Sequence, residues 1–507
     1  MTTASGAPID LAHLDLDSFA GQPVAVLGMA RSGVALARFL ADRGARVTAY
    51  DARPADELAD AIARLEGRAV ELRLGPDVDP AAVLEGQALV CTSPSVSSRF
   101  PTTEPRLRAA LGALEHEGRV PVVSEVDLFL RLCPARTVGV TGTKGKTTTS
   151  SMIAAVLARG DAPVLLGGNI GRPLIEELPG LTPRHRVVLE LSELQLPTLS
   201  RGTHIAVYTH VTADHVDRHG SVEAYRAVKR ILARLAPADG ALVLDDEDPV
   251  SRAFGEGSPA GTQVTYRRGA PRTGGVGVED GWLVAAGVPV LDAPGRTVHG
   301  RVLPLDAMPV PGWHSVSNAA AAIAAGILSG IDARSVRAGL EAFGGVEHRL
   351  EPVAVSDGVR YVNDSQGTQP DAVAAALRAF PAPVVLIAGG RAKGLDMAEL
   401  ATVVAERAAA AVLIGESGPD LETAFRAAGL ARTQRAGTLE DAVGQADAVA
   451  RELLGAAGPG ATVTVLLSPA AASFDMFRDY EARGRAFKDA VRALVARRGS
   501  TSEETRP

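Results

Sequence analysis

The chain has 507 residues, which is too long for a single hydrophobic core and fits about three domains. Hydrophobic residues make up 46% and charged residues 22% of it, which is typical of a globular protein, and the net charge of −7 argues against a nucleic-acid partner. Its two cysteines, Cys91 and Cys133, are too few for a disulfide framework and favour a reducing compartment. We find no signal-peptide pattern in the first 17 residues and no apolar run of about 18 residues, and therefore expect a cytoplasmic protein that binds no membrane.

The first segment after the polar N-terminus has the pattern of a βαβ unit. A strand, a glycine-containing turn and a helix lead to a second strand at 46–50, which ends at Asp51. This order is typical of a Rossmann-like nucleotide site. Ala30 stands where a strict dinucleotide fingerprint has glycine, so the signal for a nicotinamide cofactor is weak, and a nucleotide sugar diphosphate would suit the same helix N-terminus. A further strand at 88–92 runs into a turn that begins at Ser93, at the strand end where ligands usually bind.

The second segment starts near residue 123 and contains a phosphate-binding pattern. An apolar strand-like run leads into a glycine-rich turn that ends in Gly-Lys-Thr and opens into a helical pattern at 150–157. Small residues let backbone N–H groups converge on a polyphosphate, the lysine adds a positive charge, and the threonine hydroxyl can bind Mg²⁺. The turn is tighter than the common phosphate loop, whose first glycine would fall at Val140. The pattern predicts ATP binding by Gly142, Thr143, Lys144, Gly145, Lys146, Thr147 and Thr148.

Two later strands of this segment lead to residues that suit a metal site. One strand-like run ends at Glu190, a carboxylate of the kind that binds hard cations, although the position equally fits a solvated loop charge. Another precedes His215, whose position also fits a helix cap. Lys229 lies in a helical pattern where the residues alone favour an exposed lysine. Alternating strands and helices indicate a parallel sheet, and the glycine- and proline-rich stretch at 255–301 predicts a small β-hairpin region.

The third segment, from about residue 347, predicts a second doubly wound α/β domain. Three apolar strand-like runs alternate with helical patterns. Asp364 follows a strand, and Lys393 follows a Gly-Gly turn that lets a cation face a cleft. Arg349 lies near the domain boundary, where a guanidinium can clamp a phosphate or simply belong to a linker. Ser473 ends a turn of small residues that can present polar groups to a carboxylate or merely turn the chain.

Together these motifs resemble those of the Mur ligases of bacterial cell-wall synthesis, roughly from residue 20 to 490. Beyond the phosphate loop the resemblance rests on Gly168-Asn169-Ile170-Gly171, Glu190-Leu191-Ser192 with Gln195, Asp214-His215, Tyr225 with Lys229, His348-Arg349, Asn363-Asp364-Ser365 and 467–473. The ending at 477–487 is most similar to the D-glutamate-adding members. The resemblance implies an α/β fold of three domains. The first is a Rossmann-like UDP-binding domain at 1–122, and the second is a central phosphate-loop ATPase-type domain with a parallel sheet at 123–346. The third is a C-terminal Rossmann-like amino-acid-binding domain at 347–507, with a disordered tail from about residue 497.

The resemblance also implies the groups around ATP. It suggests two Mg²⁺ ions, one on Thr147 beside the phosphates and one held by Glu190, His215 and Lys229. Family members carry a carbamylated lysine at the position of Lys229, where CO₂ adds to the neutral amine and turns a cation into a carboxylate. Asn318 is expected on the adenine side, with Arg349 and Asp364 on the phosphate and ribose. The catalytic residues implied are Lys146, His215, Lys229 and Lys393.

The substrate-binding residues follow from the same resemblance. Asp51 and Ser93 would face the uridine diphosphate end of the substrate. The muramoyl-alanine part would be held by Asn169, Ser192 and Gln195, and the incoming D-glutamate by Thr368, Lys393, Ser473 and Tyr480. Five positions depart from the family pattern, with serine at Ser95 in place of glycine, serine at Ser315 in place of asparagine, glutamine at Gln366 and Gln369 in place of lysine and asparagine, and tyrosine at Tyr480 in place of phenylalanine.

The reaction implied is the ATP-dependent addition of D-glutamate to UDP-N-acetylmuramoyl-L-alanine through an acyl phosphate, a step of peptidoglycan synthesis, by a monomeric enzyme. A near alternative is another Mur-type or folylpolyglutamate-type ligase that takes a different amino acid. A second alternative is a nucleotide-binding regulatory or scaffolding protein without turnover, against which the set of Lys146, Glu190, His215 and Lys229 argues. A nicotinamide-dependent oxidoreductase is the third, and it leaves the phosphate loop unexplained.

Overall fold

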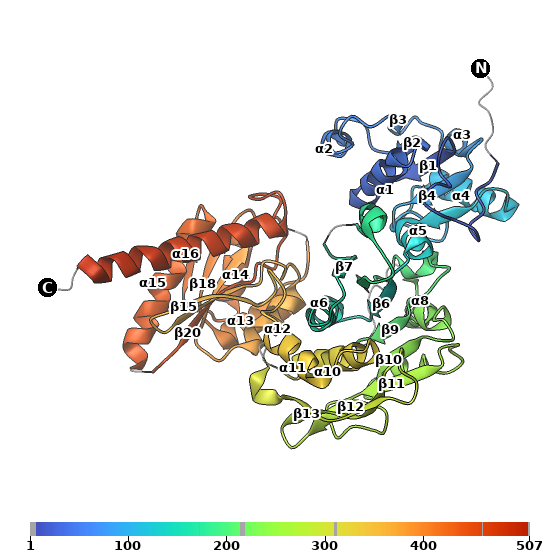
Figure 1. Cartoon of the computed structure of the whole chain (residues 1–507). Coiled ribbons are helices and arrows are strands. Elements are labelled where there is room, and N and C mark those ends of the chain that lie inside the picture. The colour runs from blue at the N-terminus through green and yellow to red at the C-terminus, as the bar shows by residue number, and fades with distance from the viewer. Residues whose placement is uncertain are drawn as a thin grey trace. The chain divides into compact units, whose positions relative to one another are not determined.

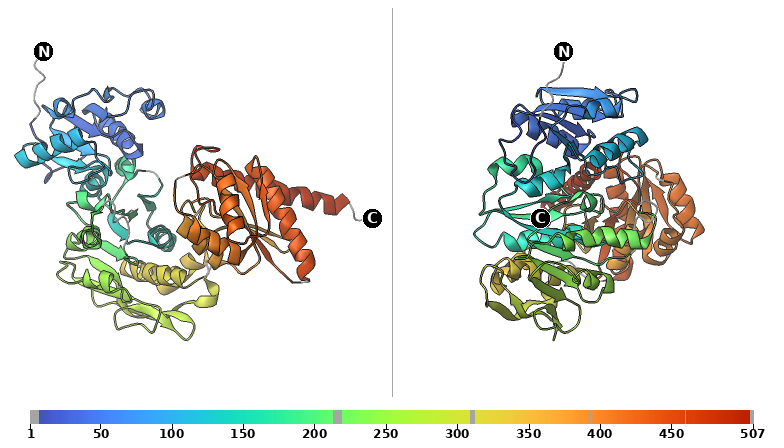
Figure 2. Two further views of the ribbon diagram at one scale, coloured as in Figure 1. Left: turned by 180° about the vertical axis from the view of Figure 1, so that it is seen from behind. Right: turned by 90° about the vertical axis from the view of Figure 1, so that its right-hand side faces the viewer.

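The computed structural model describes residues 7–171, 173–212, 219–308, 312–392, 394–458 and 460–504. The chain divides into two compact units, one formed by Met1–Met308 with Trp313–Phe343 and the other by Pro309–Gly312 with Gly344–Pro507 (Figures 1 and 2). Three sheets carry the fold, two in the first unit and one in the second. The predicted α/β class with three sheets is thereby confirmed. Within the described ranges, none of the helices combines the length and the apolar composition that a bilayer-spanning segment requires.

The N-terminal sheet has five parallel strands in the order β3-β2-β1-β4-β5. Its central strand β1 is buried on both faces, because helices cover both sides of a parallel sheet. The strands are β1 Pro23–Leu27, β2 Arg46–Asp51, β3 Val70–Leu74, β4 Leu89–Thr92 and β5 Val122–Ser124. The helices are α1 Arg31–Asp42, α2 Ala59–Ala63, α3 Pro80–Leu84, α4 Pro105–Glu117 and α5 Glu125–Leu132.

The central sheet has nine strands in the order β14-β13-β12-β11-β10-β9-β6-β8-β7. Its strands are β6 Arg136–Thr141, β7 Val164–Gly168, β8 Arg186–Glu190, β9 Ile205–Tyr208, β10 Ala241–Asp245, β11 Thr262–Tyr266, β12 Val276–Glu279, β13 Trp282–Pro289 and β14 Thr297–Pro304. The strands from β12 to β14 pair antiparallel, which confirms the predicted hairpin region. The helical segments are α6 Lys146–Leu157, η1 Leu174–Gly180, η2 Leu196–Thr198, α8 Val222–Arg234, α9 Pro249–Ala253, η3 Leu305–Ala307, α10 Trp313–Leu328 and α11 Ala333–Glu341.

The second unit contains a six-stranded sheet in the order β15-β16-β20-β17-β18-β19, parallel except for the edge strand β15. Its strands are β15 Glu351–Ser356, β16 Val359–Asn363, β17 Val384–Gly389, β18 Ala408–Ile414, β19 Thr433–Arg435 and β20 Val463–Leu467. Alternate strand residues feed two separate hydrophobic clusters, so helices cover both faces of this sheet. They are α12 Pro370–Ala379, α13 Ala398–Arg407, α14 Gly418–Ala427, α15 Leu439–Ala457 and α16 Tyr480–Glu504 (Figure 1).

Helix α16 continues beyond residue 497, where the sequence predicts the start of a disordered tail. The two arginines at 497 and 498 favour a helix, although the Gly-Ser-Thr-Ser run that follows them does not. Arg498 also gives this turn a tertiary anchor, because its guanidinium forms an ion pair with Asp447 of α15. Burial acts to raise the pKa of Asp447, but the hydrogen bonds from Arg498 and Tyr361 outweigh it and hold that pKa below its usual value.

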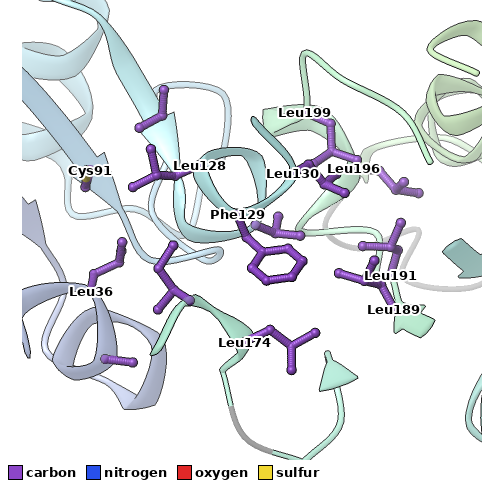
Figure 3. Close-up of a cluster of buried hydrophobic side chains, with 14 of the residues drawn as sticks. Leu36, Cys91, Leu128, Phe129, Leu130, Leu174, Leu189, Leu191, Leu196 and Leu199 are labelled. Atoms are coloured by element: carbon purple, nitrogen blue, oxygen red, sulfur yellow. The ribbon is translucent and has the colours of Figure 1, made fainter. Parts of the chain in front are cut away.

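One hydrophobic cluster joins the first two sheets (Figure 3). Phe129 of α5 is fully buried and lies between Leu36 of α1 and Leu189 of β8, with Leu174 of η1 beside it. Helix α5 therefore contributes its apolar side chains to a core that belongs to both sheets. This shared core explains why the N-terminal and central sheets form one compact unit.

We expect Phe129→Ala to destabilise this unit strongly, because truncating a buried phenylalanine costs about 3–5 kcal/mol through lost transfer energy and the cavity that remains. Differential scanning calorimetry should show a lower transition temperature for the unit that contains the first two sheets. Phe474→Ala is the matched control, since Phe474 is 65% exposed and its truncation should change stability by less than about 0.5 kcal/mol. Equal transition temperatures for the two variants would contradict the shared core.

Candidate active site

The phosphate loop connects β6 to α6 and requires glycine at two positions. Gly142 and Gly145 have φ angles of +147° and +88°, in the region that favours glycine. A Cβ atom added to Gly145 would lie 2.7 Å from Oδ1 of Asn318, so the loop backbone packs directly against α10. Gly145 is also the N-cap residue of α6, where the helix dipole and free N–H groups favour an anion. The loop thus has the backbone form that phosphate binding needs.

Two side chains of the loop are engaged within the protein. The Thr143 hydroxyl donates to the carbonyl of Thr212 at 3.1 Å and lies 3.0 Å from the Tyr225 hydroxyl, and the Thr143 N–H donates to the His210 carbonyl. Lys146 Nζ donates to the carbonyls of Gly142 at 3.2 Å and Thr143 at 2.8 Å. The ammonium group therefore lies across the turn, at the place where a polyphosphate would approach. Lys144 is exposed, and Thr147 and Thr148 are half-buried in the first turn of α6.

Glu190 ends β8 beside the loop, because β8 pairs with β6 in the register that sets Glu190 opposite Val140. Its side chain is 2% exposed, and Oε1 accepts a hydrogen bond from Asn169 Nδ2 at 2.9 Å. The Asn169 N–H donates to the Glu190 carbonyl, also at 2.9 Å. Oε2 is buried and has no hydrogen-bond partner among the described residues. A buried carboxylate oxygen without a donor is costly, and a hard cation would satisfy it.

Lys229 is fully buried, so the exposed position that its helical pattern favours is wrong. It lies on α8, with Nζ 3.3 Å from Oγ1 of Thr141 and 5.4 Å from the centre of the Tyr225 ring. The Tyr208 hydroxyl donates to the Lys229 carbonyl at 2.8 Å and fixes this turn of the helix. Thr141, which ends β6, was not predicted as a site residue, although its place directly before Gly142 was a signal for it.

The predicted metal set cannot be assembled in full, because His215 lies outside the described residues. Across the described ranges, no group of three or more His, Cys, Asp or Glu side chains is arranged to hold a metal ion. Glu190 and Lys229 do lie near the same loop. Glu190 is opposite Val140 in the pairing of β6 with β8, and Lys229 Nζ donates to the hydroxyl of Thr141, the residue directly before Gly142. The residues that are described thus fit a cation at the loop, and the complete ligand set stays a prediction.

The turn after β8 is held by two of the predicted substrate residues. The Oε1 atom of Gln195 accepts hydrogen bonds from the Ser192 N–H at 2.9 Å and from the Ser192 hydroxyl at 3.1 Å. Both side chains are buried. This interlock leaves the Gln195 amide nitrogen and the Ser192 lone pairs as the groups available to a substrate.

At the N-terminal sheet, Asp51 and Ser93 both contact the glycine turn after β1. Oδ2 of Asp51 accepts from the Met29 N–H at 2.8 Å, and the Ser93 hydroxyl donates to the Gly28 carbonyl at 3.0 Å. Burial acts to raise the pKa of Asp51, but hydrogen bonds from Arg53 and Met29 hold it below its usual value. Asp51 is therefore an ionised acceptor at the carboxyl edge of the sheet, where nucleotides usually bind.

The second unit brings several predicted residues to the loops after β16 and β20. Asp364 accepts hydrogen bonds from the Ser468 hydroxyl at 2.6 Å and from the Leu350 N–H at 3.1 Å. Burial raises the pKa of Asp364 to about 6, against the hydrogen bond from Ser468. Arg349 is half-buried and directly precedes Leu350, whose N–H donates to Asp364.

The three described residues of the predicted D-glutamate pocket also belong to these loops and to the first turn of α16. Ser473 is buried, whereas Thr368 and Tyr480 are half-buried. The Tyr480 carbonyl accepts a hydrogen bond from the Ser365 hydroxyl at 2.8 Å, and its ring meets His348 edge-on at 6.2 Å between centroids. Lys393 lies outside the described residues.

Comparisons with known proteins identify the family. Residues 140–326 match the Mur ligase middle domain, and residues 348–470 match the Mur ligase glutamate ligase domain. The chain is 40% identical over 473 residues to the UDP-N-acetylmuramoylalanine–D-glutamate ligase of Symbiobacterium thermophilum, an alignment that covers 93% of this chain and 98% of that protein. The chain belongs to the Mur ligase family. Members of this family use ATP.

Other relatives agree with this assignment. The UDP-N-acetylmuramoylalanine–D-glutamate ligase of Pelotomaculum thermopropionicum is 39% identical over 482 residues, with 94% of this chain and 99% of that protein covered. Among solved structures, UDP-N-acetylmuramate–alanine ligase from Thermotoga maritima has a TM-score of 0.55 at 18% identity and covers 93% of this chain and all of that one. MurF from Acinetobacter baumannii has a TM-score of 0.53 at 16% identity, with 87% of this chain and 91% of that one covered. At such identities these structures support the fold alone.

One departure from the Mur ligase pattern is visible in the second unit. Gln366, which stands where the family has lysine, keeps its backbone in the loop by donating its N–H to the His348 carbonyl at 2.9 Å. Its side-chain Oε1 is buried and has no hydrogen-bond partner among the residues described. Replacing a cation with an amide therefore changes the charge of this loop while its backbone stays hydrogen-bonded.

We expect Gly145→Ala to weaken ATP binding by about tenfold or more, because the added Cβ meets Asn318 and a left-handed backbone costs a residue with a side chain about 1–2 kcal/mol. Calorimetric titration with a non-hydrolysable ATP analogue measures this directly. Gly180→Ala serves as the control, since nothing lies within 4 Å of the Cβ it would add. Wild-type affinity in Gly145→Ala would refute the loop as the nucleotide site.

Proposed function

We propose that the chain catalyses the ATP-dependent joining of D-glutamate to UDP-N-acetylmuramoyl-L-alanine, the reaction named for its relatives. The observation that carries this proposal is the identity of about two residues in five over nearly the whole length of both proteins. The reaction belongs to peptidoglycan synthesis. We further propose a cytoplasmic monomer with domains at 1–122, 123–346 and 347–507.

The chemical difficulty of the reaction is that a carboxylate is a poor acyl donor. The alanyl carboxylate first attacks the γ-phosphorus of ATP, which releases ADP and gives an acyl phosphate. The amine of D-glutamate then attacks the acyl carbon to give a tetrahedral intermediate, which expels phosphate and leaves the amide. The amine loses its proton in this step, and His215 is our candidate to accept it.

Lys146 and the first turn of α6 supply the positive charge for the transferred phosphoryl group. Lys146 Nζ already lies at the mouth of the loop, on carbonyls that it can leave for a phosphate oxygen. The free N–H groups of α6 add the positive end of a 12-residue helix. Arg349 and Asp364 are proposed for the phosphate and ribose, and Asn318 for the adenine side.

A divalent cation fits the residues around the loop, and we assign Thr147 to one Mg²⁺ and Glu190, His215 and Lys229 to a second. Bound there, Mg²⁺ would neutralise the charge of the phosphates. The unpartnered Oε2 of Glu190 supports this assignment. Carbamylation of Lys229 would replace a fully buried ammonium with a carboxylate, the ligand type that Mg²⁺ prefers.

The substrate residues are proposed in three groups according to their place in the fold. Asp51 and Ser93, at the turn after β1, would bind the uridine diphosphate end. Asn169 and the interlocked pair of Ser192 and Gln195 would bind the muramoyl-alanine part, next to Glu190. The D-glutamate pocket would be formed by Thr368, Lys393, Ser473 and Tyr480.

Phosphate release with ATP, Mg²⁺ and UDP-N-acetylmuramoyl-L-alanine should depend on D-glutamate when D-glutamate, L-glutamate, L-alanine and diaminopimelate are offered singly. Lys146→Ala should abolish this release, because the variant loses the charge that stabilises the transferred phosphoryl group. Release with another amino acid would keep the ligase reaction and point to Gln366 and Gln369 as determinants of specificity. Absence of release with every acceptor would refute the proposal.

Lys229→Ala should cut the ligase rate by at least about tenfold, and a short carboxylic acid such as acetate should restore part of it by replacing the carbamate. The rate is followed by phosphate release over a range of acetate concentrations, with chloride at the same ionic strength as the salt control. Lys146→Ala is the matched variant, because a lysine that acts as a cation gains nothing from a carboxylate. Rescue of both variants, or of neither, would argue against carbamylation.

A further inference from the structure

Arg483 is the largest fully buried side chain in the described part of the chain. It lies in the first turn of α16 and is 1% exposed. Arginine is seldom buried without a carboxylate partner. Yet among the described residues no carboxylate lies within ion-pair distance of this guanidinium, so its burial needs another explanation.

The five N–H groups of Arg483 form five hydrogen bonds to four acceptor atoms, and four of these bonds go to backbone carbonyls, with the Ala471 carbonyl accepting two of them. Nε donates to the Ser365 hydroxyl at 3.0 Å. Nη1 donates to the carbonyls of Ala471 at 3.2 Å and Ala472 at 3.3 Å. Nη2 donates to the carbonyls of Ser365 at 2.9 Å and Ala471 at 3.2 Å. The planar fork of the guanidinium is therefore fully hydrogen-bonded.

These acceptors lie on two loops that follow neighbouring strands. Ser365 comes after β16 and Ala471 after β20, and the two strands pair in parallel with Asn363 opposite Leu467. A direct hydrogen bond also joins the loops, from the Ala470 N–H to the Gly367 carbonyl at 2.9 Å. The Arg483 side chain fills the space between them and fixes how far apart they lie.

The same three segments contain the described residues of the proposed D-glutamate pocket. Thr368 follows Ser365 on the first loop, Ser473 follows Ala472 on the second, and Tyr480 shares the first turn of α16 with Arg483 itself. The Ser365 hydroxyl continues the network to the Tyr480 carbonyl at 2.8 Å. A change at the guanidinium thus acts on the two loops that carry Thr368 and Ser473 and, through the Ser365 hydroxyl, on the Tyr480 carbonyl.

We propose that Arg483 is a positioning residue that sets the geometry of the acceptor pocket for D-glutamate without touching the amino acid. This inference rests on the proposed function. Lysine cannot take over the role, because an ammonium has three donors at one point, whereas four acceptors surround a planar fork here. Removing the fork should therefore displace Thr368, Ser473 and Tyr480 relative to one another and impair D-glutamate binding more than ATP binding.

The test compares Arg483→Lys and Ser365→Ala with Arg492→Ala, a control on the same helix whose arginine is 65% exposed. Phosphate release gives kcat and KM for D-glutamate, ATP and UDP-N-acetylmuramoyl-L-alanine, and thermal unfolding is recorded for each variant. We expect KM for D-glutamate to rise about tenfold in Arg483→Lys and a few fold in Ser365→Ala, with KM for ATP within about twofold of wild type. The Arg492→Ala variant should match the wild type throughout.

A purely structural role predicts a lower unfolding temperature with unchanged KM values, and that result overturns the inference. An equal rise of KM for ATP and D-glutamate overturns it as well. Where Arg483→Lys fails to fold, the same criteria apply to Ser365→Ala, which removes one acceptor and keeps the charge. A wild type that releases no phosphate with D-glutamate overturns both the proposed function and this inference, whereas an active wild type with unaltered variants overturns the inference alone.

Discussion

The parallel pairing of β6 with β8 and β9 is the constraint on which the nucleotide site depends. It brings the carboxyl ends of three strands to one edge, so that the phosphate loop, Glu190 and the segment after β9 lie together although the sequence separates them. The loop is then held from both sides, by His210 and Thr212 after β9 and by Asn318 from α10. The position of the loop relative to Glu190 is therefore set by the pairing of the strands and not by the loop residues.

A buried ionisable side chain in each unit differs in how completely the protein satisfies its hydrogen-bonding groups. The Arg483 guanidinium satisfies all of its donors on carbonyls and one hydroxyl, so it is complete without a ligand. Glu190 is only half satisfied, since Asn169 holds one oxygen and the other has no partner among the described residues. A fully bonded group fixes the protein's own geometry, whereas a group with an unused buried atom favours a ligand.

Sequence reasoning recovered the three sheets, the phosphate loop and the family, because glycine turns and apolar strand runs are local signals. It did not place Lys229 correctly without the resemblance, because burial of a lysine depends on Thr141 and Tyr225, which come from other parts of the fold. Arg483 was visible only as part of a motif, and its four acceptors lie more than ten residues away along the chain. Contacts of this kind are set by tertiary packing and leave no periodic pattern.

The ion pair at the end of α16 has a practical consequence for handling the protein. Asp447 is 2% exposed, and its charge is compensated by Arg498 and by Arg451, whose Nε lies 3.4 Å from Oδ1. The polar composition of the C-terminus suggests that it could be removed. Truncation after residue 497 would, however, leave the buried Asp447 carboxylate without the Arg498 guanidinium. The turn that carries Arg498 therefore fastens α16 to α15, and a purification tag is better attached at the other end of the chain.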